Sequence, residues 1–426
     1  MSGGRLQLAI KGVEFTYLSA KPQTSLFRHQ YNRITYFAME PQEVNSSNRI
    51  SFGSKFKFII PPGADLLSHS FLKFQLPNLE ELFPDVPNIS YTNGIGHALF
   101  ESIEFVVGST VISKLSTYSL DIMSNFQNSE IKEGYDRMIG KEKRETFFKN
   151  CFDTSSKTSF ILPLRFWFSK NISTSFPLCC VKQPISIVVT TKSLKDVVIS
   201  DYDLVFPSNT IPIEMSLINN IVLLDKSERL ILQKNPQIHL IEQNKITKYG
   251  IPPHVDEVKI PLILNHPIKT LRFVIVRDDR TKYSTSLSES SSLEDIENIH
   301  YGNDYFNYSD KLVYQETKLC YENTFKQAKI TMNSSERIPF MDAEYFRSIQ
   351  PYQHDIVIPK EQIYTYSFAS SISLSQPSGF CNFTPIKTSF LELKVKPQEI
   401  TRIVYILSTN YNLLRFNSSS CHLKYS

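Results

Sequence analysis

The stretch QPSGFCNFT, residues 376–384, places three chemical signals next to one another. Cys381 is a thiol that could be reactive. Asn382-Phe383-Thr384 is a sequon, which a secreted protein would carry glycosylated. The residues before them, Pro377 to Gly379, are turn formers. The stretch therefore fits a redox site, a glycan site or a corner in the chain, and the rest of the sequence has to decide among them.

A second stretch, GYDRMIGK at residues 134–141, has glycines and a lysine in the order of a phosphate-binding loop. Such a loop needs four residues between its glycines and Ser or Thr after its lysine. Five residues separate Gly134 from Gly140, and Glu142 follows Lys141. We therefore interpret the two glycines as turns around a short helical piece.

The histidines and cysteines form no catalytic or metal-binding motif. The nine histidines are scattered, without HExxH, HxH or a grouping with Asp and Ser. The six cysteines include no CxxC pair, and a bond between the adjacent Cys179 and Cys180 would be strained. Carboxylates for glycoside hydrolysis need not be sequence neighbours, so a pair stays open, but nothing marks one out. We expect no enzyme activity, no cofactor and no metal.

Trp167 is the single tryptophan of the chain and lies among Phe166, Phe168 and Phe176. Such a group could line a sugar-binding face. Aromatic side chains also supply the largest apolar area to a protein core. Burial in the core is the favoured interpretation.

The bulk composition is that of a folded protein with sheets. A chain of 426 residues exceeds one ordinary core, so two domains are expected. The 30 Phe and 21 Tyr favour the half-buried surfaces of strands. The net charge is +4, and residues 1–40 hold five basic against two acidic side chains. This mild excess does not indicate a nucleic-acid binder.

Targeting signals are not found in the sequence. The start MSGGRLQLAIKGVEF has no apolar signal-peptide core, and Ser2 stands where myristoylation needs a glycine. No apolar run reaches the ~18–20 residues that cross a bilayer. We expect a soluble chain, made in the cytosol, with reduced thiols.

Alternation with a period of two recurs along the whole chain and predicts antiparallel strands. In KFKFII, Phe56 and Phe58 share a face opposite Lys55 and Lys57. The stretches ESIEFVVGSTVI (residues 101–112), LRFVIV (271–276) and FLELKVKP (390–397) behave in the same way. With turn residues between the strands, an antiparallel β-sandwich is predicted.

Helical signals are few and short. DKSERLILQK begins with the capping candidates Asp225 and Ser227, and DAEYFRSIQ begins with Asp342. LDIMSNF places Leu120 and Met123 three residues apart. A layered β/α fold would need longer helices, so the fold class is predicted to be all-β.

The segment Arg277–Asp310 is rich in Ser and Asp and lacks apolar periodicity. It is too long for an ordinary connection, which predicts a long surface loop at about 277–310. Strand-rich stretches lie on both sides of a break near residues 200–215. This pattern divides the chain into domains 1–212 and 213–426.

The opening GGRLQLAIKGVEFTYLSAKPQTSLFRHQYNRITYFAME resembles the start of the major capsid proteins of nucleocytoplasmic large DNA viruses, including iridovirus, phycodnavirus and mimivirus members. The residues that fit are Gly3, Gly4, Gln7, Leu8, Gly12, Tyr17, Leu18, Pro22, Gln23, Phe27, Tyr31, Arg33, Phe37 and Ala38. Asn32-Arg33-Ile34 departs from the paired basic residues that are usual there.

The resemblance continues in the same order along nearly the whole chain. The matching stretches are ADLLSHSFLKFQLP, GHALFESIEFVVGSTVI, LPLRFWF with FPLCCV, LDKSERL, HLIEQ, LNHPIKTLRF, AEYFRSIQPYQHD, YSFASSISLSQPSGFCNFT and NYNLLRF. Arg165 stands where proline is common, and residues 277–319 match least well.

The resemblance implies a double jelly roll, with two tandem eight-stranded antiparallel β-sandwiches and a few short helices. It implies a homotrimer with a pseudo-hexagonal outline, tiling an icosahedral virion capsid over an internal membrane that the chain lies near but does not span. Neighbouring capsomers, minor capsid proteins and a penton protein would be its partners, without direct nucleic acid contact. Such chains are made and assembled in the host cytoplasm, and their N-terminal domain includes a base segment.

The same resemblance answers the question raised by QPSGFCNFT. In the family this turn joins two strands of the second jelly roll, so we interpret the stretch as a structural corner with Cys381 as a small apolar residue. Pro385 also makes its sequon a poor acceptor. Asn307, in the sequon NYS, ranks first for surface glycosylation.

Two other functions stay open at this point. A minor capsid or scaffold paralogue would share the fold. A tandem jelly-roll protein that binds or hydrolyses glycans would need exposed aromatics or convergent carboxylates in one cleft.

Overall fold

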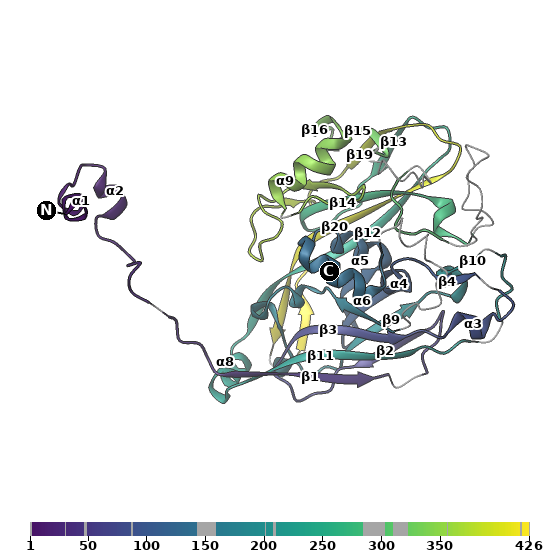
Figure 1. The fold of residues 1–426 in the computed structure, drawn as a ribbon, viewed down its shortest axis with the longest axis horizontal. Coiled ribbons are helices and arrows are strands. Elements are labelled where there is room, and N and C mark those ends of the chain that lie inside the picture. Colours follow the sequence, from purple (N-terminus) through teal and green to yellow (C-terminus); the bar gives the residue numbers. More distant parts are fainter. Residues whose placement is uncertain are drawn as a thin grey trace. The chain divides into compact units, whose positions relative to one another are not determined.

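The computed structural model describes most of the chain in two units, Met1–Tyr36 and Phe37–Ser426. The described residues are 2–29, 31–46, 49–86, 88–142, 159–200, 202–207, 210–283, 303–309, 323–355, 357–417 and 420–425. The short unit holds α1 (Gly3–Ala9) and α2 (Phe15–Ser19), and neither helix buries a residue. The long unit holds the strands (Figure 1).

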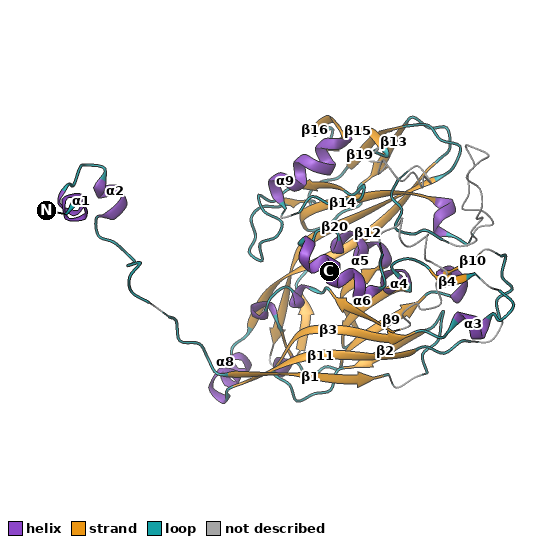
Figure 2. Ribbon diagram, in the orientation of Figure 1, coloured by secondary structure: helices purple, strands orange, loops and turns teal. Residues whose placement is uncertain are grey.

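Two four-stranded paths of antiparallel sheet form the first half of the long unit (Figure 2). Their orders are β1-β11-β3-β7 and β2-β9-β5-β6. The first path contains β1 (Phe37–Asn45), β3 (Leu66–Gln75), β7 (Ser159–Leu164) and β11 (Glu214–Leu224). The second contains β2 (Lys55–Ile59), β5 (Phe100–Val107), β6 (Thr110–Ser116) and β9 (Ile185–Thr191). This arrangement, in which the last strand returns between the first and third, is a jelly roll.

The second half repeats the same strand order with unrelated residues. Its paths are β12-β20-β14-β17 and β13-β19-β15-β16. The strands are β12 (Gln237–Ile251), β13 (Glu257–Pro261), β14 (Pro267–Arg277), β15 (Phe325–Met332), β16 (Ser335–Asp342), β17 (Tyr364–Ser367), β19 (Ser389–Val395) and β20 (Arg402–Asn417). Short additions are β4 (Ile89–Tyr91), β8 (Phe176–Pro177), β10 (Val198–Ser200), β18 (Cys381–Asn382) and β21 (Ser420–Leu423). The predicted double jelly roll of two eight-stranded sandwiches is confirmed.

Strand pairing moves the predicted domain boundary. Phe37 of β1 pairs with Leu224 of β11, and β11 also pairs with β3. β11 is therefore the last strand of the first sandwich, although the predicted boundary at 212/213 assigned it to the second. The sequence break near 200–215 marks the connection into that returning strand, and the second half begins only at α8 (Lys226–Lys234).

The helices of the long unit are short in its described part. They are α3 (Leu79–Leu82), α4 (Ile95–Ala98), α5 (Thr117–Ser124), α6 (Ser129–Ile139), α8 and α9 (Gln350–His354). Single turns occur at η1 (Trp167–Ser169), η2 (Ile172–Thr174), η3 (Leu178–Cys180), η4 (Leu194–Val197), η5 (Asp278–Thr281) and η6 (Tyr345–Ile349). Among the described residues no helix is long and apolar enough to cross a membrane.

Helical residues follow both of the predicted capping positions, Asp225 and Asp342. The Asp225 carboxylate accepts a hydrogen bond from the Ser227 backbone N–H and caps α8, as predicted. Asp342 is the last residue of β16, where it pairs with Gln327 of β15. Helical residues follow it directly at Ala343 and continue as a π-helical turn from Tyr345.

Each sandwich has its own apolar core, and Trp167 lies in the first. Its exposed fraction is 7%, and its ring centroid lies 5.5 Å from that of Phe105 in an edge contact. Phe105 also contacts Phe166, Phe168 and Phe176, with centroid distances of 5.1–5.7 Å. The predicted burial of the aromatic group is confirmed, and no sugar-binding face is formed by it.

β14 is buried on both of its faces, which the alternating pattern LRFVIV did not predict. Leu271, Phe273 and Ile275 point into the core of the second sandwich. Val274 and Val276 belong to a third apolar cluster, together with Tyr118 of α5. One face of β14 therefore closes its own sandwich, and the other packs on the first sandwich.

The QPSGFCNFT stretch is a corner, as predicted. β18 pairs with the beginning of β14, and Gly379 has φ 142°, a value that side chains disfavour. A Cβ at Gly379 would lie 2.7 Å from the Phe368 carbonyl oxygen. Cys381 packs against the second core. Glycine is therefore required for this close turn.

Candidate functional site

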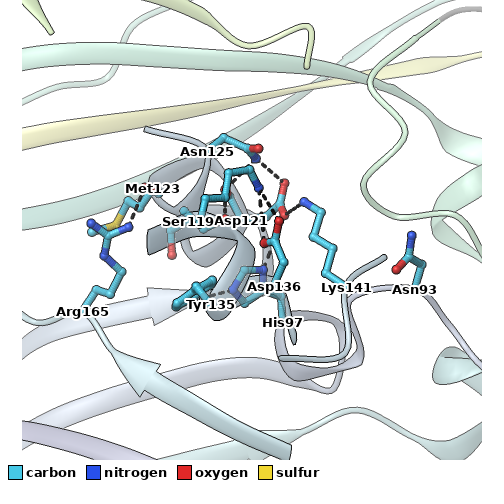
Figure 3. Close-up of polar contacts among 12 residues, drawn as sticks. Asn93, His97, Ser119, Asp121, Met123, Asn125, Tyr135, Asp136, Lys141 and Arg165 are labelled. Carbon is cyan, nitrogen blue, oxygen red and sulfur yellow. Dashed lines mark hydrogen bonds and ion pairs between the residues drawn. The ribbon is translucent and has the colours of Figure 1, made fainter. Parts of the chain in front are cut away.

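Polar side chains gather where the two sandwiches meet, in a group that we call the junction cluster: His97, Asp121, Tyr135, Lys141 and Tyr308. Figure 3 labels the first four of these residues. His97 lies in α4, Asp121 in α5 and Tyr135 in α6, while Lys141 follows the end of α6. These four belong to the first half of the long unit. Tyr308 comes from the described segment 303–309 of the second half. The cluster therefore joins elements distant in sequence.

Two glycines bring the helices of the cluster together. Gly140 ends α6 with φ 69°, so that Lys141 can turn toward Asp121. A Cβ at Gly96 of α4 would lie 2.7 Å from Cβ of Ile139. The interpretation of GYDRMIGK as turns around a helical piece is thus right for Gly140, whereas Gly134 lies inside α6.

Asp121 is the centre of the cluster and is fully buried. Its Oδ1 lies 2.5 Å from Lys141 Nζ and 3.4 Å from His97 Nδ1. Its Oδ2 accepts a hydrogen bond of 2.6 Å from the Tyr308 hydroxyl and one of 3.2 Å from Asn125 Nδ2. Both carboxylate oxygens are therefore satisfied, as a buried charge requires.

The pKa shifts follow from burial and this pairing. Burial alone would raise the pKa of Asp121, but the Lys141 ammonium and His97 hold it well below its usual range. Burial lowers the pKa of His97, and the neighbouring carboxylate only partly offsets this. Burial would also lower the pKa of Lys141, yet Asp121 raises it. At neutral pH the cluster is thus an Asp121–Lys141 ion pair beside a neutral His97.

The His97–Asp121 pair has the form of a base and its orienting carboxylate, but in the described part of the chain no solvent-exposed nucleophile contacts it. The other ring nitrogen of His97 lies 2.8 Å from the Tyr135 hydroxyl, which is buried as well. Burial raises the pKa of Tyr135. Since His97 and Asp121 have no solvent-exposed surface, a substrate cannot reach them. The arrangement is suited to holding elements together.

The segment that contributes Tyr308 was predicted to be a surface loop, and its described end at residues 303–309 is mostly buried instead. Asn303 is fully buried, and Tyr305 and Tyr308 pack in the apolar cluster between the sandwiches. Arg280, with 1% exposure, donates to the carbonyl oxygen of Ser309. The surface prediction is therefore wrong for residues 303–309, whose polar side chains are paired inside. Residues 284–302 and Asp310 lie outside the described part.

Asn307 is not on the surface, contrary to the glycosylation prediction. Its exposed fraction is 3%. Its Nδ2 donates to Asp304 Oδ2 at 3.1 Å, and its Oδ1 accepts from the Ser309 backbone N–H and hydroxyl. A glycan on Nδ2 would need this turn to open. The sequon pattern shows residue type but not burial, which explains the error.

Sequence reasoning did not find the junction cluster. His97 was one of nine scattered histidines, and Lys141 was noted only for a phosphate-loop pattern that it failed to complete. The partners Asp121 and Tyr308 are separated by 187 residues. A local motif cannot contain such a pair, so only the tertiary structure reveals it.

The short unit has the opposite character, with no described side chain buried. Tyr17, Leu18 and Phe27 are each at least 88% exposed. Its basic residues are Arg5, Lys11, Lys21, Arg28 and Arg33, against the single acidic residue Glu14. This combination of exposed apolar and basic side chains is typical of a segment that contacts a partner.

Two family models match consecutive parts of the chain. Residues 25–225 match the model described as the major capsid protein N-terminus. Residues 228–421 match the model described as the large eukaryotic DNA virus major capsid protein. The gap between the two matches falls at the start of α8, where strand pairing places the boundary.

Curated relatives match over the whole length. The major capsid protein of Pyramimonas orientalis virus is 27% identical and that of Phaeocystis pouchetii virus 25%, each covering 100% of both chains. Among solved structures, VP54 of Paramecium bursaria Chlorella virus 1 covers 94% of this chain and 100% of its own, with 22% identity and a TM-score of 0.75. The Faustovirus major capsid protein covers 92% and 93%, with 10% identity and a TM-score of 0.71.

The fold, the strand order and these matches agree, and the relatives are structural proteins of capsids rather than enzymes. The chain belongs to the major capsid protein family of large eukaryotic DNA viruses.

Proposed function

We propose that three copies of this chain form a pseudo-hexagonal capsomer that tiles an icosahedral shell. The observation that carries the proposal is the duplicated jelly roll: two sandwiches with the same strand order lie in one compact unit. Three such chains place six similar sandwiches around one axis, which approximates six-fold symmetry. The similarity to the chain in the PBCV-1 virus capsid supports this arrangement.

The junction cluster has a role in this proposal. A subunit that has to present two sandwiches at a fixed angle to its neighbours gains from a rigid contact between them. The Asp121–Tyr308 hydrogen bond connects the two halves, and the buried Lys141 pairs with the same carboxylate from within the first half. Buried polar networks of this kind restrict the relative position of the elements that they join.

The short unit is proposed to act as the base segment of the capsomer. Its exposed apolar and basic side chains would contact the minor capsid or penton proteins of the shell, close to the internal membrane but without spanning it. The two sandwiches would contact the neighbouring capsomers. Direct contact with nucleic acid is not part of the proposal, because a net charge of +4 in 426 residues gives no concentrated basic face.

Synthesis and assembly in the host cytoplasm fit the same proposal. A minor capsid or scaffold paralogue would have the same fold, and its copy number in purified virions distinguishes it from the major subunit. For a glycan-binding or glycan-hydrolysing protein, the buried Trp167 removes the sequence feature that favoured it.

Oligomeric state tests the proposal directly. Purified recombinant chain should elute as a particle of three times 49.1 kDa, about 147 kDa, in size-exclusion chromatography with light scattering. Negative-stain microscopy should show three-fold particles with hexagonal outlines. An interface on the order of 2,000 Å² or more per contact is expected for such an obligate assembly. A monomer at micromolar concentration would contradict the proposal.

A further inference from the structure

Cys179 and Cys180 form a vicinal dithiol at the surface of the first sandwich. They end the turn η3, between β8 and β9, and both are half-buried. Their sulfur atoms lie 3.9 Å apart. They line a cavity of about 230 Å³, whose other lining residues are Lys182, Leu232, Gln233, Asn235 and Phe416.

Hydrogen bonds fix the pair against α8. The backbone N–H of Cys179 donates to the carbonyl oxygen of Asp65 at 3.1 Å. Gln233 Nε2 donates to the carbonyl oxygen of Cys179 at 3.4 Å, and the Cys180 thiol donates to that of Leu232 at 3.4 Å. Because α8 opens the second half of the long unit, the dithiol lies where the two halves are connected in sequence.

The two thiols are not equivalent. The Cys179 S–H can donate to the Cys180 sulfur, and this hydrogen bond lowers the pKa of Cys180 while it raises the pKa of Cys179. Burial instead raises the pKa of Cys421, to about 12, and that of Cys381. Of these four thiols only Cys180 has a lowered pKa, and it lines a cavity that the exposed Lys182 also lines.

A bond within the pair is disfavoured by geometry. The sulfur atoms would have to move from 3.9 Å to about 2.05 Å. The Cα atoms of adjacent residues lie about 3.8 Å apart across a trans peptide, below the usual 4.4–6.8 Å of disulfides. A strained disulfide is easily reduced. The favourable reaction partner is therefore an external disulfide.

We propose that Cys180 is a thiol–disulfide exchange site for a small disulfide that carries carboxylates, with Cys179 as the positioning residue that donates a hydrogen bond to it. The Cys180 thiolate attacks one sulfur of the small disulfide. A new S–S bond forms to Cys180, the original S–S bond breaks, and the departing thiolate takes up the proton that Cys180 released. One protein thiol is thereby oxidised to a mixed disulfide and half of the small disulfide is reduced to a thiol. Lys182 pairs with a carboxylate of the bound half.

Glutathione disulfide is the probe for the test. The reduced, desalted full chain is incubated with it, and peptide mapping should find glutathione on Cys180 in preference to the other described cysteines, Cys179, Cys381 and Cys421, removed again by dithiothreitol. Cys179→Ala should slow the reaction, since loss of the hydrogen bond raises the pKa of Cys180 and reduces its thiolate fraction more than it increases the nucleophilicity of the thiolate. The pH at which the rate is half-maximal should rise in the same variant.

Matched variants separate the roles. Cys421→Ser should react like wild type. Lys182→Gln should slow the reaction with glutathione disulfide but leave that with the uncharged hydroxyethyl disulfide unchanged. Modification of another cysteine with Cys180 left free would overturn the proposal, as would the loss of two hydrogens from the chain, which indicates an internal disulfide. Since the decisive mapping uses wild-type protein, it does not depend on the folding of a variant or on the assembly proposed above.

Discussion

Replacing Asp121 by Asn tests the junction cluster with the smallest possible change in shape. The amide keeps an acceptor oxygen for the Tyr308 hydroxyl, but it removes the charge that faces Lys141 Nζ at 2.5 Å. The side chains of Asp121 and Lys141 are 0% and 11% exposed, so water cannot replace the lost partner of the ammonium. Removing one member of a buried ion pair costs about 3–5 kcal/mol.

Differential scanning calorimetry of the full chain measures this cost. In a cooperative unit of 150–250 residues, about 1 kcal/mol corresponds to roughly 2–4 °C in Tm, so Asp121→Asn should lower the midpoint by roughly 6–20 °C. The matched control is Glu133→Gln in α6, because Glu133 pairs with Arg137 at 2.7 Å with both side chains more than 70% exposed. Its effect should stay within about 0.5 kcal/mol.

A double variant shows whether the destabilisation comes from an unpaired buried charge or from lost packing between residues 121 and 141. Asp121→Leu together with Lys141→Met replaces the ion pair by apolar side chains of similar volume, which is often neutral or stabilising. The double variant should therefore be more stable than Lys141→Met alone, which leaves the Asp121 carboxylate unpaired. If Asp121→Asn melts within 2 °C of the Glu133→Gln control, the buried Asp121–Lys141 pair does not stabilise the junction cluster as argued.

Three further predictions concern the pH dependence of stability, two glycines and the short unit. The folded-state pKa of Asp121 is below its unfolded value of about 3.9, so the stability that this carboxylate contributes is present above that pH and is lost as the pH falls further. Between pH 5 and 3 the Tm of wild type should therefore fall more than that of Asp121→Asn. Gly96→Ala should destabilise by about 1–3 kcal/mol because its Cβ meets Ile139, whereas Gly134→Ala, with nothing within 4 Å in an exposed helix position, should stabilise by about 0.4–1 kcal/mol in the same melting assay. Deleting residues 2–36 should leave the Tm of the remaining unit within about 2 °C of that of the full chain, since none of the described residues among them is buried. A large loss of Tm would show that these residues contribute to its core.

Local patterns predicted the strands because apolar and polar residues alternate where a strand buries one face and exposes the other. In KFKFII the lysines are exposed and Phe56 and Phe58 are buried, as the period of two requires. β14 does not follow this rule because its second face is buried too. On that face Val274 and Val276 pack in the apolar cluster between the two sandwiches. The sequence thus indicated the junction, because Val274 and Val276 are apolar at positions where a strand with one buried face has solvent-exposed residues.

The parts that sequence reasoning missed all depend on distant partners. A segment such as 303–309, polar in composition, reads as a surface loop because its own residues cannot form a core. It is buried because Asp121, Thr92 and Arg280 supply hydrogen bonds to its side chains and carbonyl groups. Polarity therefore predicts exposure only when no complementary charge lies elsewhere in the chain. In a duplicated fold that complement can come from the other half, as Asp121 and Thr92 of the first half provide it for residues 303–309 of the second.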